Sequence, residues 1–374
     1  TKITSAHQNL ADVQVKCHHL LQTGTRLAHV MKISRILHAG YLFESEQTTL
    51  LFDPIFENPF SRNCHAFPAV QFDIEKVGQL CVQAIFISHY HDDHCSFESL
   101  ALLNRDTPIY LYCLHEEMFS MLRALGFQQI YRLNIDHAVT IGSFVVTPRR
   151  ALADDIDCMF HLQAEGMHVL NVVDALIAPE DLPALTGNNA WDMVLWPYQT
   201  MRELDVICPR QAVPATGEIP EEWIEQLQAL APRYVVASAC QFRQESWSWY
   251  NHAFFPITYQ CFMETVANRL PGTTAVRLNP SVSVELTPTD LSYAPSLEWV
   301  TLLENPDVDY DYQPSLIPPD MAEIANHFPA LLPGETDLVI QYCTNDLPAI
   351  FHALDPTGDL YFEKSRLWRL SLYD

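Results

Sequence analysis

The sequence predicts an α/β fold, in which short buried strands alternate with helices. Ala84–Ile87 is a continuous apolar run with the length and composition of a buried strand. Phe97–Leu103 follows it and has the pattern of a helix. With 374 residues, 48% of them hydrophobic, the chain is long enough to bury one large core with a smaller module attached.

The segments on either side of this strand–helix unit predict further strands. Upstream, Ile36–Ser45 and Thr48–Pro54 are apolar stretches separated by Glu46-Gln47, which is the pattern of a β-hairpin. Downstream, His168–Asp174 follows a Glu165-Gly166 turn and ends on an acidic residue. These strands predict a sheet whose edge carries polar side chains next to the loop that follows Ala84–Ile87.

That loop contains a His-x-His-x-Asp-His motif formed by His89, His91, Asp93 and His94. Imidazole nitrogens and carboxylate oxygens are the ligands that zinc takes, and they also suit iron or manganese. His89 and His91 are two residues apart, so in extended backbone both side chains project to the same side and can bind one ion. Asp93 and His94 lie on the turn into the helix, where we expect them to face a second ion. The motif therefore predicts a metal site.

On these residues the chain resembles the metallo-β-lactamase superfamily, whose hallmark is this motif in a four-layer αβ/βα sandwich. The resemblance covers roughly residues 33–285 and implies a catalytic domain over that range. Residues 1–32 have apolar positions at helical spacing and predict a leading helix. Residues 286–374 predict a small α+β extension that caps the active site or forms a dimer interface.

Within that extension the sequence predicts three elements. Asp320–His327 has the pattern of a helix. Asp337–Tyr342 and Leu360–Phe362 are candidate strands, and Pro356-Thr357-Gly358 forms a turn before the second of them.

Two aspartates outside the motif match the family pattern. The Asp53-Pro54 pair looks like the signature that ends the second strand of the family. Asp174 matches the aspartate that bridges two ions. An aspartate at a strand end is often only a turn or cap residue. Next to the histidine motif, the interpretation of Asp174 as a ligand is favoured, because a carboxylate between two cations lowers their repulsion.

The first departure from the family is a missing histidine after the strand predicted at Gly142–Pro148. Three aspartates follow this strand: Asp154, Asp155 and Asp157. One of them could replace the histidine as an oxygen ligand, and Asp155 is included in the predicted ligand set. Alternatively, the first ion is held only by His89, His91 and Asp174.

The second departure is the last histidine of the family, which has no obvious counterpart. After the strand predicted at Tyr234–Ala239 comes Cys240, and the next imidazole is that of His252, in an aromatic segment. His252 is a candidate ligand, with packing among the aromatic rings as the alternative. Cys240 is expected to be a small buried residue.

The resemblance implies a metal-dependent hydrolase that uses an activated water on a small-molecule ester, lactone, amide or phosphodiester. The predicted catalytic residues are Asp93, which would orient the water, and Asp92 or His65, which could protonate the leaving group. Residues 94–133 are most similar to the branch that contains ascorbate-type lactonases and CMP-N-acetylneuraminate hydroxylases. A di-iron hydroxylase on the same fold and a metal-binding protein with a degenerate site are the alternatives.

The net charge and the composition limit the classes of partner that we expect. The net charge of −25, from 46 acidic and 21 basic residues, argues against nucleic acid because a phosphate backbone would be repelled. No apolar run is long enough to span a bilayer, so no membrane association is expected. The ten cysteines are scattered without a framework, which is typical of reduced thiols in a cytoplasm. A homo-oligomer remains open.

Overall fold

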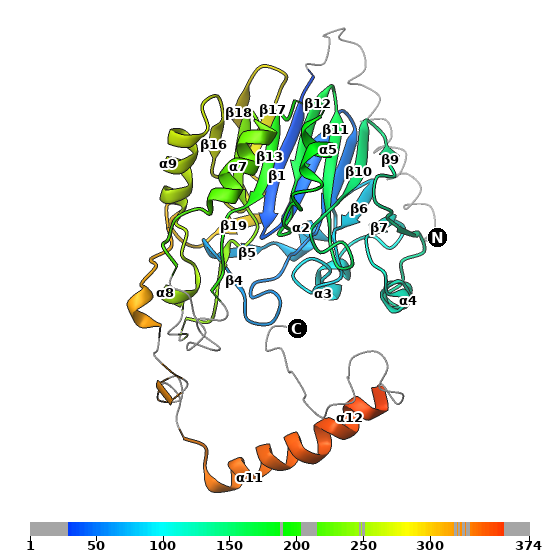
Figure 1. The fold of residues 1–374 in the computed structure, drawn as a ribbon. Helices are drawn as coiled ribbons and strands as arrows, with labels where there is room; N and C mark the ends of the chain where they lie inside the picture. Colours follow the sequence, from blue (N-terminus) through cyan, green and yellow to red (C-terminus); the bar gives the residue numbers. More distant parts are fainter. Residues whose placement is uncertain are drawn as a thin grey trace, which may run out of the picture.

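Two mixed β-sheets form the centre of the computed structural model (Figure 1). The first sheet has eight strands in the order β18-β17-β1-β2-β3-β6-β7-β8. Their bounds are β1 (Met31–Leu37), β2 (Gly40–Ser45), β3 (Thr48–Phe52), β6 (Ala84–Ile87), β7 (Ile109–Leu111), β8 (Ile130–Arg132), β17 (Ser283–Leu286) and β18 (Leu291–Ala294).

The second sheet has seven strands in the order β16-β14-β13-β12-β11-β10-β9. Their bounds are β9 (Val139–Ile141), β10 (Phe144–Arg150), β11 (Cys158–Ala164), β12 (Met167–Asn171), β13 (Met193–Pro197), β14 (Tyr234–Ser238) and β16 (Thr274–Val276). Two short strand pairs lie outside these sheets: β4 (His65–Ala66) with β15 (Phe242–Arg243), and β5 (Val70–Phe72) with β19 (Val300–Leu302).

The structure describes residues 29–187, 190–202, 215–246, 248, 251–317, 320, 322–323, 326 and 330–354. The strand predicted at Leu360–Phe362 lies outside this range. So do residues 1–28 of the helix predicted in the first 32 residues, and four of the eight residues of the helix predicted at Asp320–His327. Among the described residues, none of the helices has both the length and the apolar character needed to cross a bilayer.

The inner faces of the two sheets pack directly on each other. The Phe52 ring on β3 meets the Phe160 ring on β11 edge-on, at 5.1 Å between centroids. Nearby, the hydroxyl groups of Tyr41 on β2 and Ser238 on β14 form a hydrogen bond of 2.8 Å between the sheets. Burial of these side chains is the main favourable contribution to folding, and their interdigitation fixes how the sheets align.

Helices supply the connections between the parallel strands of each sheet, because parallel neighbours need a crossover. In the first sheet these are α2 (Ile74–Val77), α3 (Phe97–Leu100) and α4 (Glu116–Ala124). In the second sheet they are α5 (Leu182–Thr186), α7 (Glu221–Leu230) and α9 (Tyr259–Arg269), and α8 (Asn251–Phe254) precedes α9. With the inner faces occupied, the crossover helices cover the outer faces. This arrangement confirms the predicted four-layer αβ/βα sandwich.

The boundary predicted at residue 285 is corrected, since it falls inside β17. β17 pairs with β1 and with β18, so the first sheet continues to Ala294. Further along, β19 pairs with β5 and the Tyr310 ring is buried in the core. The chain therefore contributes to the sandwich for about 25 residues beyond the predicted boundary.

The strand predicted at Asp337–Tyr342 is wrong, because these residues are helical. After the short turn η2 (Pro314–Leu316), α11 spans Pro333–Gln341 and continues through the π-turn η3 (Tyr342–Asp346) into α12 (Leu347–Leu354). The Glu335 carboxylate accepts a hydrogen bond of 2.8 Å from the Leu332 N–H, and Pro333 occupies the first turn, where no N–H is needed. From Pro333 to Leu354 the predicted α+β extension is thus helical, and Figure 1 shows this helical segment apart from the sandwich.

The turn at Gly142 brings the two sheets close together. Gly142 has a φ of +55°, and a Cβ atom on it would lie 2.0 Å from the Thr48 Oγ1 at the start of β3.

We expect Gly142→Ala to lower the free energy of unfolding by about 2–4 kcal/mol through strain and this clash, as measured by urea denaturation. Gly166→Ala is the matched control, because its φ is +78° and no atom lies within 4 Å. Its expected cost is about 1 kcal/mol, and equal losses for both variants would contradict the clash.

Candidate metal centre

The motif loop leaves the sheet at the carboxyl end of β6. It runs from Ser88 to His94 and is followed by α3, which begins after Ser96. The Ser96 hydroxyl accepts a hydrogen bond of 3.1 Å from the Ser99 N–H and so caps the helix. β6 is a buried central strand, so the loop starts from a rigid element.

Asp53, at the end of the neighbouring strand β3, anchors this loop. Its Oδ1 accepts the Ser88 N–H at 2.7 Å, and its Oδ2 accepts the Ser88 hydroxyl at 2.7 Å and the His94 Nδ1–H at 3.0 Å. Asp53 is fully buried, so these donors replace the water that its charge would otherwise need. Its carboxylate therefore fixes both ends of the motif.

These hydrogen bonds also determine which ring nitrogens face the site. Because the His94 Nδ1 donates to Asp53, its Nε2 is left for a ligand. The Ser88 hydroxyl donates its proton to Asp53 and therefore accepts from the His89 Nδ1, at 2.9 Å. His89 is thus held in the same tautomer, with its Nε2 turned toward His91.

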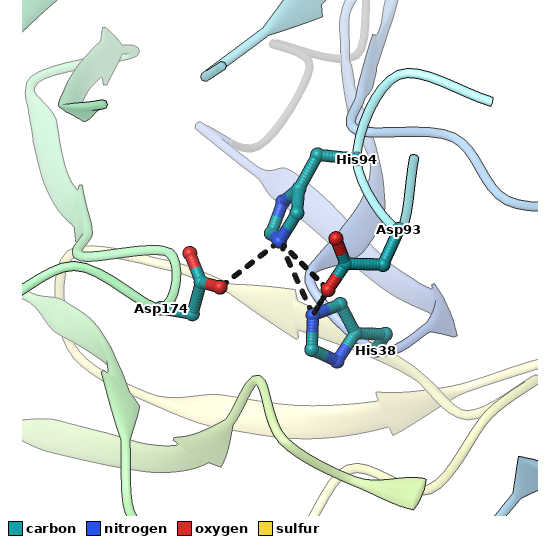
Figure 2. A group of neighbouring side chains, drawn as sticks. All are labelled: His38, Asp93, His94 and Asp174. Atoms are coloured by element: carbon teal, nitrogen blue, oxygen red, sulfur yellow. Dashed lines mark hydrogen bonds and ion pairs between the residues drawn. The ribbon is translucent and has the colours of Figure 1, made fainter. Parts of the chain in front are cut away.

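Four side chains converge beside the motif loop, as Figure 2 shows: His38, Asp93, His94 and Asp174. The His94 Nε2 lies 3.1 Å from the Asp174 Oδ2, 3.5 Å from the Asp93 Oδ2 and 3.2 Å from the His38 Nε2. The Asp93 Oδ2 and the His38 Nε2 are also 3.2 Å apart. Each residue offers one ligand-type atom, and all four atoms lie within 4.8 Å of one another.

These separations fit a bound cation. Ligands held at 2.0–2.1 Å from a tetrahedral zinc ion lie about 3.3 Å from one another, close to the distances around the His94 Nε2. The Asp174 Oδ1 and the Asp157 Oδ1 are buried without a hydrogen-bond partner, which is costly for a carboxylate unless a cation is nearby. The residues present therefore fit a metal ion.

A second group lies next to the first and shares Asp93 with it. Its members are His89, His91 and Asp93. The His89 Nε2 and the His91 Nδ1 are 3.1 Å apart, so both histidines turn a nitrogen to the same point. Asp93 belongs to both groups, whereas Asp174, which the sequence suggested as the bridge, belongs to the first.

Asp174 is brought to the site by a strained turn after β12. Val173 has a φ of +64°, which is uncommon for a β-branched residue. The Val173 N–H donates to the Asn171 Oδ1 at 3.1 Å, and this contact stabilises the turn. Residues held in such conformations concentrate at functional sites, where the surrounding structure enforces them.

The groups of the site perturb one another strongly. Burial alone would lower the pKa of His94, but the carboxylates of Asp174 and Asp93 hold it well above its usual value. Burial would raise the pKa of Asp174, but the imidazoles of His94 and His89 hold it below its ordinary value. Burial and the charge of His94 lower the pKa of His89 to about 3. The metal-free site thus contains an imidazolium between carboxylates, and a cation would replace its proton.

His38 was missed by the sequence analysis, which treated Ile36–Ser45 as one strand. The structure divides this segment into β1 and β2, joined by a tight turn in which His38 has a φ of +50°. Gly40 is the signal that marks the turn, since a Cβ on it would lie 2.8 Å from the Asp53 carbonyl oxygen. A glycine inside an apolar run often indicates a bend or a close backbone approach.

The structure places two of the predicted ligands, His252 and Asp155, away from these groups. The His252 ring is exposed on α8 and lies 3.2 Å from the carbonyl oxygen of Asp311. Asp155 is exposed in the turn before β11. Neither belongs to the two groups. The imidazole that lies beside Asp93 is that of His38, at 3.2 Å.

Of the three aspartates that could replace the missing histidine, Asp157 is the one that interacts with the site. Burial, followed by the charge of Asp174, raises the pKa of Asp157 to about 7. Asp154 instead pairs with Arg150, at 3.0 Å. The sequence analysis named all three aspartates and put Asp155 in the ligand set. It could not identify Asp157 instead, because the turn that selects one aspartate is set by the packing of β11.

The predicted proton donors lie outside the two groups as well. Asp92 is exposed and accepts a hydrogen bond of 2.5 Å from the Ser61 hydroxyl. His65, on β4, lies 2.9 Å from the Glu245 carboxylate. Asp93 is the one predicted catalytic residue that lies within both groups. The roles of Asp92 and His65 as proton donors stay predictions.

Comparisons with solved structures found similar folds. The chain resembles Igni18, a metallo hydrolase from Ignicoccus hospitalis, with a TM-score of 0.45 and 15% identity over 69% of this chain and 98% of that one. It also resembles an isothiocyanate hydrolase from Delia radicum gut bacteria, with a TM-score of 0.48 and 15% identity over 66% and 95%. A further similar structure is that of CmlA, a diiron β-hydroxylase from Streptomyces venezuelae, with a TM-score of 0.45 and 16% identity over 69% of this chain and 54% of that one. No protein-family model and no curated protein matches the sequence.

We expect Asp53→Asn to weaken metal binding by about 10- to 100-fold, because the amide loses the charge that holds the His94 Nδ1–H and disturbs both ends of the motif. Competition with a chromophoric chelator measures this change. Asp106→Asn, at an exposed position that belongs to neither ligand group, is the control and should bind metal as the wild type does. Unchanged affinity in Asp53→Asn would show that Asp53 does not orient the ligands.

The raised pKa of Asp157 predicts a pH-dependent stability in chelator-treated protein. The folded-state pKa, about 7, exceeds the unfolded value near 4, so ionising Asp157 destabilises the fold as the pH rises between these values. Asp157→Asn removes that cost. We expect it to stabilise the metal-free protein by about 1–3 kcal/mol at pH 8.5 and to have little effect at pH 4, measured by urea denaturation. An equal gain at both pH values would refute this explanation.

Proposed function

We propose that the protein is a metal-dependent hydrolase acting on a small molecule. The observation that carries this proposal is the pair of ligand groups that share Asp93, one with His89 and His91 and one with His94 and Asp174. Such adjacent groups are typical of two-metal hydrolytic sites.

The residues of the site have separable roles. His89, His91, Asp93, His94 and Asp174 would hold the ions, and Asp53 and Ser88 keep the imidazoles of His94 and His89 in the tautomer that leaves Nε2 free. Bound metal would supply a nucleophile at neutral pH by lowering the pKa of water, together with a Lewis acid for the developing oxyanion. Asp93, 24% exposed, would accept a hydrogen bond from the attacking water and so orient it.

The substrate class follows from the same chemistry. An activated water attacks a carbonyl carbon or a phosphorus centre, so we propose an ester, lactone, amide or phosphodiester of small size. A net charge of −25 disfavours polyanions such as nucleic acids. Zinc suits the imidazole-rich group, and manganese or iron suits the carboxylate-rich group. We therefore propose zinc, manganese or iron as the bound metal.

A di-iron oxygenase is the second candidate, and Asp157 is the observation that favours it. With Asp157, the carboxylates near the motif are Asp93, Asp174 and Asp157, and the set becomes rich in oxygen. Carboxylate and imidazole ligands with open positions are typical of non-haem iron sites that activate oxygen. Such an activity would require an external reductant.

Elemental analysis of protein purified without chelators or added metal tests the proposal. We expect about two ions of zinc or manganese per chain and turnover of at least one ester, lactone, amide or phosphodiester. Asp93→Ala should lower both the metal content and kcat/KM, the latter by about 10²–10⁴-fold, because both groups lose a member. His137→Ala, an exposed histidine whose ring contacts the carbonyl oxygen of Ile135, is the matched control.

Two iron ions with reductant-dependent oxygen consumption and no hydrolysis would replace this proposal by the oxygenase. Protein that binds none of these metals at micromolar concentration would refute both candidates.

A further inference from the structure

His38 has the position of a metal ligand, but its hydrogen bonds assign it another role. Its Nδ1 lies 3.1 Å from the backbone nitrogen of Cys240, which donates to it. A backbone N–H is a donor only, so the His38 Nδ1 must present a lone pair. A neutral imidazole carries one proton, and that proton is therefore on Nε2.

The His38 Nε2 lies 3.2 Å from two atoms, the Asp93 Oδ2 and the His94 Nε2. The His94 Nε2 is already directed to the Asp174 Oδ2, at 3.1 Å. The Asp93 carboxylate is therefore the acceptor that remains for the proton on the His38 Nε2. To bind a cation through Nε2, the neutral ring would have to move its proton to Nδ1. There the proton would face the Cys240 N–H, with two donors opposed at 3.1 Å and no acceptor between them.

The residue whose N–H sets this tautomer is also held through its carbonyl group. The Tyr310 hydroxyl shares its proton between the Cys240 carbonyl oxygen, at 3.2 Å, and the Phe242 carbonyl oxygen, at 2.8 Å. Ala239 and Cys240 have φ values of +35° and +47°. This region is unfavourable for non-glycine residues, so packing must enforce the conformation that points the Cys240 N–H at the His38 ring.

The His38 backbone is fixed as well. The Arg35 guanidinium is fully buried and donates to the His38 carbonyl oxygen at 2.5 Å and to the Ala237 carbonyl oxygen at 2.8 Å. This contact ties the β1–β2 turn to β14, the strand that leads to Cys240. The His38 ring itself is 1% exposed and packs against the rings of Phe60 and Phe242, with centroids 5.5 and 5.8 Å away.

We propose that His38 is a positioning residue, which donates a hydrogen bond from Nε2 to Asp93 in a tautomer imposed by the Cys240 peptide, and that it is not a metal ligand. The cation beside it would then be held by Asp93, His94 and Asp174. Three protein ligands leave a coordination position open, as in catalytic rather than structural zinc sites. This inference rests on the proposed metal centre for its consequence, but the assignment of the tautomer does not.

The tautomer can be read directly by NMR on protein labelled with ¹⁵N at histidine, before and after addition of zinc. Comparison of the wild type with His38→Gln assigns the His38 signals. We expect a protonated Nε2 and an unprotonated Nδ1 in both states. A zinc-loaded spectrum with the proton on Nδ1 and the metal on Nε2 would overturn the proposal.

Metal stoichiometry and affinity give an independent test with matched variants. The amide of His38→Gln can still donate a hydrogen bond to Asp93 but is a poor ligand. We expect this variant to keep the wild-type number of ions, with a Kd within about threefold of the wild type. His38→Ala, which loses the donor, should bind about tenfold more weakly. His94→Ala is the positive control and should lose one ion per chain.

Loss of one ion in His38→Gln, with circular dichroism showing a folded protein, would make His38 a ligand and refute the proposal. If the wild type binds no zinc, the proposed hydrolase fails, whereas the spectrum of the metal-free protein still decides the tautomer. A protonated Nδ1 there would refute the inference on its own. The two failures are therefore distinguishable.

Discussion

The buried carboxylate of Asp53 is the constraint on which the rest of the site depends. It lies at the end of one central strand and accepts hydrogen bonds from the loop that leaves the next strand. A buried charge of this kind is stable only when donors surround it, and here the donors are the loop backbone, the Ser88 hydroxyl and the His94 ring. The same contacts that stabilise Asp53 therefore select the tautomers of His94 and, through Ser88, of His89. Folding of this loop therefore also determines which ring nitrogens of His89 and His94 face the site.

Around this anchor, the loops that reach the site are strained while the sheets that carry them are regular. The non-glycine residues with positive φ in these loops come from both sheets: His38, Asp53, Val173, Ala239 and Cys240. Each of these positive-φ conformations is unfavourable for the residue alone, so the packing of the two sheets must compensate for its free-energy cost. Asp93, Asp174 and His38 meet because the sandwich fixes the strands from which their loops start, and the loops then have little freedom left.

The sequence predicted those parts of the structure that are encoded over short distances. The motif on the loop after β6, the hairpin around Glu46-Gln47 and the strand before Asp174 all depend on local pattern. The four-layer fold was implied by the family resemblance that these residues carry. His38 could not be found in this way, because its partner Cys240 lies 202 residues away and only the packed sheets bring them together. Asp157 could not be chosen over its neighbours for the same reason: its burial depends on Asp174 and the body of the sandwich rather than on its own turn.

The two ligand groups are chemically unequal, and this asymmetry bears on the reaction. His89 and His91 provide imidazole nitrogens, whereas Asp174 and the shared Asp93 provide oxygens beside His94. Imidazole favours zinc, and carboxylates favour harder ions such as manganese, so one motif offers two unlike positions a few ångströms apart. If His38 donates to Asp93 instead of binding metal, the carboxylate-rich position is also the more open one. A substrate oxygen would then enter on the side of Asp174. The hydrogen bond from His38 would meanwhile keep the Asp93 carboxylate oriented between the two metal positions.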